Sequence, residues 1–82
     1  MAQMQPTAGG KVEALSNVTY DLVTVLSNCG EAVDALDDYI DDARRENDSD
    51  VVQLFEKIRQ DEINHCNMAK GLIENLVKQG KF

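Results

Sequence analysis

The chain has 82 residues and a net charge of -7, and it contains only 5% aromatic residues and no tryptophan. So short a chain forms at most one domain, whose core is marginal unless a metal, a cross-link or another copy completes it. The negative charge disfavours nucleic acids and anionic membranes as partners and favours cations. No apolar run is long enough to cross a bilayer, no secretory signal opens the chain, and two cysteines are too few for a secreted disulfide framework, so we expect a soluble cytoplasmic protein.

The first helix is expected after a short arm. Residues 1–10 hold the only proline and the pair Gly9-Gly10, show no periodicity, and are predicted to form a flexible N-terminal arm. A helical domain is expected over residues 11–82. From about Lys11, apolar residues recur at alternating spacings of three and four, at Leu15, Val18, Leu22, Val25, Cys29, Ala32, Leu36, Tyr39 and Ala43. Further apolar residues widen this stripe enough for more than one neighbour, at Val12, Leu26, Val33 and Ile40.

An acidic turn separates the first helix from the second. Residues 44–50 contain no apolar side chain and offer Asp48 or Ser49 as a helix N-cap. The second helix is expected over residues 50–79, with Gly80 as its terminator. The sequence therefore predicts an all-α antiparallel helical hairpin. Because a lone hairpin exposes half of each apolar stripe, we expect a homodimer that forms a four-helix bundle.

Two polar residues interrupt the periodic apolar pattern of the second helix. Its expected seam consists of Val51, Phe55, Ile58, Glu62, His65, Ala69, Leu72 and Leu76. A carboxylate and an imidazole three residues apart on one helix face can bind one metal ion, whereas burying either one alone is costly. We therefore expect Glu62 and His65 to be paired in the core. They are either metal ligands or a core histidine satisfied by Glu62 or by a hydroxyl across the bundle.

Glu62 and His65 form a Glu-x-x-His motif, which dinuclear carboxylate bundles carry on two of their four helices. With Tyr39, the acidic turn and Met68, the region 28–76 resembles the two-helix half of the ferritin-like superfamily and is most similar to encapsulated ferritins. The resemblance implies hairpins whose dimers build a di-iron ferroxidase site between subunits, assemble into rings and can be cargo of a protein shell. It also implies Glu62 and His65 as iron ligands and Tyr39 as a residue near the catalytic site.

The resemblance implies a third ligand as well, a glutamate seven residues before Tyr39. That position holds Ala32, and the glutamate comes one residue earlier, as Glu31. One residue on a regular helix is a rotation of about 100°, which turns Glu31 away from the core unless a one-residue bulge restores it. Glu31 remains a candidate ligand. Without it, a dimer offers two carboxylates and two imidazoles, enough for one ion of iron, zinc or manganese, or for a poorer pair of ions.

The two cysteines allow three interpretations. With a turn centred between Asn47 and Asp48, residues whose numbers add to about 95 lie level across the hairpin, and Cys29 and Cys66 meet this condition. They are buried thiols that act as small apolar residues, a disulfide across the hairpin, or soft ligands. In the last case Cys29 replaces the absent carboxylate of the first helix and shifts the preference from iron towards zinc.

The first helix also carries an acidic stripe opposite its apolar face, which is either a solvated outer surface or a funnel for cations. Its members are Glu31, Asp34, Asp38, Asp41 and Asp42. Taken together, these features predict a ferritin-like metal-binding protein that oxidises iron at a site shared between subunits. The alternatives are a non-catalytic bundle, in which the Glu62–His65 pair fixes register and partner choice, and a zinc or thiol redox module built on the cysteines.

Overall fold

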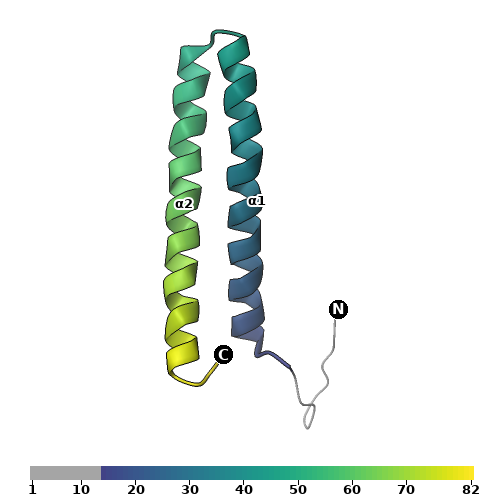
Figure 1. The fold of residues 1–82 in the computed structure, drawn as a ribbon, viewed down its shortest axis with the longest axis vertical. Coiled ribbons are helices and arrows are strands. Elements are labelled where there is room, and N and C mark those ends of the chain that lie inside the picture. Colours follow the sequence, from purple (N-terminus) through teal and green to yellow (C-terminus); the bar gives the residue numbers. More distant parts are fainter. Residues whose placement is uncertain (1–13) are drawn as a thin grey trace.

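The computed structural model describes residues 14–82, which form two long helices joined by a tight turn (Figure 1). Helix α1 runs from Asn17 to Arg45 and helix α2 from Ser49 to Lys78, and the two lie side by side and antiparallel. The molecule measures 58 × 26 × 12 Å, so it is only one helix thick. The predicted helical hairpin is confirmed, and the predicted N-terminal arm, residues 1–10, lies outside the described residues.

Side-chain caps begin both helices. The Ser16 hydroxyl accepts the backbone N–H of Thr19 at 3.1 Å, and the Asp48 carboxylate accepts the backbone N–H of Val51 at 3.2 Å. Asp48 is therefore the N-cap of α2, as one of the two predicted options. The first helix was expected from about Lys11, which lies outside the described residues; over residues 14–16 that expectation is wrong, because Ser16 has an extended backbone and its cap begins α1 at Asn17.

The residue that follows the C-cap of each helix has left-handed backbone geometry. Asn47 has φ 57°, and the N–H of the next residue, Asp48, donates to the Ala43 carbonyl at 3.1 Å. Gly80 has φ 70° and ends α2 in the same way, as predicted. Glycine and asparagine tolerate this conformation better than other residues do. The resulting connection between the helices is only three residues long, Glu46 to Asp48, which holds α1 and α2 close.

The helices pack along a seam with the alternating spacing of a coiled coil, in which the residues facing the partner helix are heptad positions a and d. Every layer of this seam pairs two residues whose numbers add to 95, as the position of the turn predicts. All sixteen seam residues are buried or half-buried: Thr19, Leu22, Leu26, Cys29, Val33, Leu36, Ile40 and Ala43 on α1, with Val52, Phe55, Arg59, Glu62, Cys66, Ala69, Ile73 and Leu76 on α2.

The two sides that flank the seam differ in chemistry. On the ion-paired side, Arg44 bonds Glu56 at 3.1 Å and Arg59 bonds Asp37 at 2.7 Å, and both pairs join α1 to α2. The opposite side carries the g positions of both helices and two apolar c positions of α2, Leu54 and Met68, and most of its large apolar side chains are exposed. We call it the apolar side, and it contains Val18, Val25, Ala32, Tyr39, Val51, Leu54, Ile58, His65, Met68 and Leu72.

The observed seam keeps the d positions of the expected one, but at each a position it uses the residue that follows the expected residue. On α2 it contains Arg59, Cys66 and Ile73, each following a residue that was expected there. The apolar stripes are wide enough for two registers, and the observed rotation is the one that forms both interhelix ion pairs. The expected seam residues that lie instead on the apolar side are Val18, Val25, Ala32, Tyr39, Val51, Ile58, His65 and Leu72. Half of each stripe therefore stays exposed, as a lone hairpin requires.

Candidate metal site

Glu62 and His65 are in direct contact at the middle of α2. The Nδ1 atom of His65 lies 3.3 Å from Oε1 of Glu62. Glu62 occupies a d position of the seam and its side chain is 30% exposed, whereas the His65 side chain, at a g position, is 57% exposed. The pair therefore extends from inside the seam to the apolar side. The prediction that His65 is buried in the seam is wrong for the single hairpin, because Cys66 takes the seam position.

The contact leaves one ring nitrogen of His65 available. When Nδ1 carries the proton, it donates to the Glu62 carboxylate, and Nε2 keeps a free lone pair. In many metal sites a carboxylate holds the ring in this way through one nitrogen while the other nitrogen binds the ion, so binding of one ion by both Glu62 and His65 requires this contact to open. Nε2 of His65 and the carboxylate of Glu62 are both donors that suit a divalent cation.

Cys29 and Cys66 form the seam layer next to Glu62. Cys29 is buried and Cys66 is half-buried, and both are free thiols. Burial raises the pKa of the Cys29 thiol, and hydrogen bonding and charge at Cys66, followed by charge and hydrogen bonding at Glu62, raise that pKa further. The prediction that the two cysteines lie level across the hairpin is therefore confirmed. Their closeness to Glu62 follows from the seam register. The apolar stripe in the sequence fitted this register and a neighbouring one equally well.

Glu31 lies apart from this cluster. It occupies an f position on the exposed outer surface of α1, which is α-helical throughout and has no bulge after Glu31. The one-residue shift that could return its carboxylate to the seam is thus absent from α1. The structure brings Glu62 and His65 together and does not bring Glu31 to them.

Ala32 holds the position from which a carboxylate could meet the pair. It is half-buried on the apolar side, and it lies level with His65 because residues at facing g positions have numbers that add to 97. This is the position at which the ferritin-like resemblance implies a glutamate. Ala32 was expected at this level from the sequence, and the g positions of both helices lie on the same side of the seam.

Tyr39 is also on the apolar side, one heptad from the level of His65. Seven residues of helix correspond to about 10 Å along the axis, so Tyr39 shares a face with the pair without touching it. Its ring is 49% exposed and packs against Phe55, with ring centroids 6.0 Å apart. This contact holds the ring at the border between the seam and the apolar side.

The donors of one chain do not enclose a metal ion. Among the described residues, no three histidine, cysteine, aspartate or glutamate side chains are grouped closely enough to bind one. The cluster offers one carboxylate and one imidazole in contact, beside two thiols. A complete site therefore needs donors from outside the chain, or a movement of the thiols.

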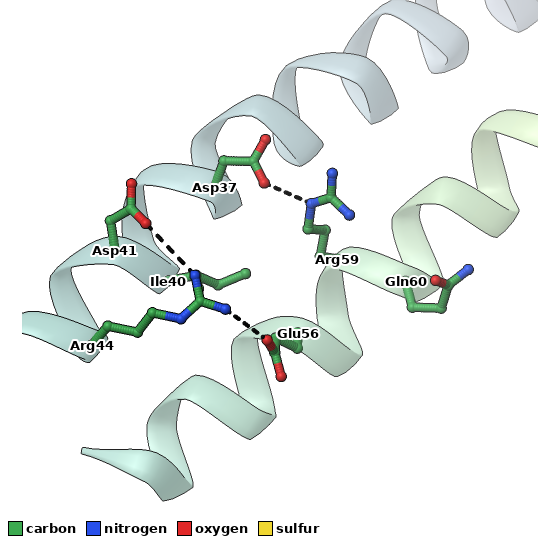
Figure 2. Close-up of a pocket in the computed structure, with 7 residues that line it drawn as sticks. All are labelled: Asp37, Ile40, Asp41, Arg44, Glu56, Arg59 and Gln60. Carbon is green, nitrogen blue, oxygen red and sulfur yellow. Dashed lines mark hydrogen bonds and ion pairs between the residues drawn. The ribbon is translucent and has the colours of Figure 1, made fainter. Parts of the chain in front are cut away.

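A second polar cluster lies on the ion-paired side (Figure 2). It lines an open hollow of about 510 Å³ over the turn-proximal half of the hairpin. Arg44 lies 3.8 Å from Asp41 and 3.1 Å from Glu56, and Arg59 bonds Asp37. Both arginines are thus neutralised by carboxylates of the hollow itself, so its charges stabilise the hairpin and present no unpaired group to a ligand.

Comparisons with protein-family models, with curated proteins and with solved structures found no match. Over the described residues, neither helix has an apolar stretch long enough to cross a membrane.

Proposed function

We propose that this protein binds a divalent metal ion at a site that two copies of the chain complete, with Glu62 and His65 of each copy as ligands. The observation that carries the proposal is the Glu62–His65 contact of 3.3 Å at a place where the seam and the apolar side meet. A half-buried carboxylate in a seam position disfavours packing unless it has a partner. His65 is that partner in the single hairpin, and a metal ion bound by both side chains would take the place of their contact.

The position of the pair supports a site shared between two copies. The 30 residues of α2 place Glu62 and His65 at its midpoint. In a symmetric dimer, residues near the two-fold axis meet their own counterparts. If the apolar sides of two hairpins pack together about an axis through their centres, the two Glu62–His65 pairs come together. Two carboxylates and two imidazoles suit one four-coordinate divalent ion.

The apolar side supports the same partner. Of the eleven large hydrophobic residues that are exposed, seven lie on it: Val18, Val25, Tyr39, Leu54, Ile58, Met68 and Leu72. Over residues 14–82 the hairpin is one helix thick, and these side chains have no second layer there. Packing two hairpins face to face gives the four-helix bundle predicted from the sequence, and the ferritin-like resemblance implies that such dimers assemble into rings. A cation in the centre offsets the repulsion between two chains of charge -7.

Iron oxidation would require more of this site than the binding of one ion. Bound iron would supply the electron transfer to dioxygen that the ferritin-like resemblance implies, with Tyr39 on the same face. That chemistry uses two ions and a carboxylate from α1. Glu31 is on the outer surface and Ala32 holds the level of His65, so this chain's residues support binding of one ion more strongly than oxidation at a pair of ions. Zinc and manganese fit the same donors.

Metal analysis tests the proposal. Full-length protein is purified without chelator and titrated with Fe(II), Mn(II) and Zn(II), alongside His65→Ala, Glu62→Gln and, as a matched control, Glu74→Gln. We expect one ion per dimer in the wild type and the control and loss of binding in the other two. Metal-free wild-type protein with full thermal stability would favour the non-catalytic bundle, in which the pair fixes register. Equal rates of oxygen-dependent Fe(II) oxidation in the wild type and Glu31→Ala would exclude Glu31 from the site.

A further inference from the structure

We propose that Cys29 and Cys66 form a reversible disulfide that joins α1 to α2 at the centre of the hairpin, by exchange with a small-molecule disulfide of the glutathione class. This modification site is separate from the metal ligands proposed above. It would give the hairpin a reduced and a cross-linked form.

The seam holds the two thiols opposite each other. Cys29 and Cys66 occupy facing d and a positions in one layer, and each is free. Cysteine is a small side chain, and in the next layer Leu26 faces only Ala69, which is 4% exposed. A disulfide needs facing Cβ atoms and a short separation between Cα atoms, which a layer of two small residues on closely packed helices favours.

The two thiols differ in access, which sets the order of the reaction. Cys66 is half-buried and Cys29 is only 7% exposed. The Cys66 thiolate attacks one sulfur of the small disulfide, forms a mixed disulfide and releases the other half as a thiolate. The Cys29 thiol then loses its proton to solvent and attacks Sγ of Cys66, which releases the second half. Two protein thiols are oxidised and one small disulfide is reduced to two thiols.

The experiment equilibrates the full chain in buffers of reduced and oxidised glutathione, with a chelator present so that metal binding does not affect the result. Acid quenching, alkylation and peptide mapping then identify each cysteine product. We expect both thiols to disappear together as an intrachain link, with no stable mixed disulfide. Cys29→Ser should stop at a glutathione adduct on Cys66, and Cys66→Ser should react slowly at Cys29. Circular dichroism checks that each variant remains helical.

A comparison with the unfolded chain makes the test independent of the variants. The same equilibrium is measured in denaturant, where the cysteines meet only by random loop closure. If the seam favours the bond, the intrachain link is favoured over the glutathione adduct by roughly tenfold or more in the folded protein relative to the unfolded one. An equal or lower preference in the folded protein, a persistent adduct on Cys66, or covalent dimers would overturn the proposal.

Discussion

Replacing Leu72 on the apolar side should weaken the proposed dimer strongly. Full burial of a leucine side chain contributes about 1.5–3 kcal/mol. Leu72 is 55% exposed in the single hairpin, so covering the rest contributes about 0.8–1.6 kcal/mol per copy by the same measure. Because each copy contributes one Leu72 to a symmetric interface, the free energy lost is about 1.6–3.3 kcal/mol per dimer. Leu72→Ala should therefore raise the dissociation constant about 15- to 200-fold.

Val77 provides the matched control for this measurement. It lies on the same helix and is 57% exposed, but it occupies an e position on the other side of the seam. Sedimentation equilibrium over a range of concentrations gives the dissociation constant for the wild type, Leu72→Ala and Val77→Ala. The reasoning predicts a large change for Leu72→Ala and little change for Val77→Ala. Equal dissociation constants for the two variants, or a wild-type protein that stays monomeric, would refute it.

Three further predictions concern single residues. Ala32→Glu should tighten metal binding by roughly tenfold, measured by calorimetric titration, because it adds a carboxylate level with His65; unchanged affinity would mean that position 32 is remote from the site. Gly71→Ala should raise the free energy of unfolding by about 1 kcal/mol in urea titrations, because a Cβ there meets nothing within 4 Å; a lower stability would place another copy against Gly71. With reductant and chelator present, unfolding stability should fall as pH rises through the ordinary thiol pKa of 9.0, because the unfolded thiol ionises there while the raised pKa of Cys29 keeps the folded one protonated. Cys29→Ala should make this fall shallower between about pH 8 and about pH 10, and an identical slope would contradict the assignment.

The hairpin could be predicted from the sequence because its signals are local. The acidic turn, the Asp48 cap and the Gly80 terminator act within a few residues, and all three are found in the structure. The pairing of residues across the seam was equally predictable, because a connection of three residues fixes which residues of α1 and α2 lie level. Cys29 and Cys66 are the clearest example, since the pKa of Cys29 responds to Cys66.

The rotation of each helix about its own axis could not be predicted from the same stripe. Leu22 and Leu36 fit both possible registers, and a choice between His65 and Cys66 as the seam residue depends on contacts between helices. The pairs Arg44–Glu56 and Arg59–Asp37 are such contacts, and neither follows from the spacing within one helix. The level of Ala32 opposite the pair was expected from the sequence, whereas the position of His65 beside the seam depends on the contacts between the two helices.

The most direct test of a shared metal site is the mass of the protein measured with and without metal, together with its metal content. Native mass spectrometry of the full chain, titrated with one divalent ion at a time, reports both quantities in one spectrum. The account predicts a dimer that carries one ion, and a monomer or a metal-free dimer for His65→Ala. A metal-bound monomer, or a wild-type dimer that binds no ion at any concentration tested, would contradict the account.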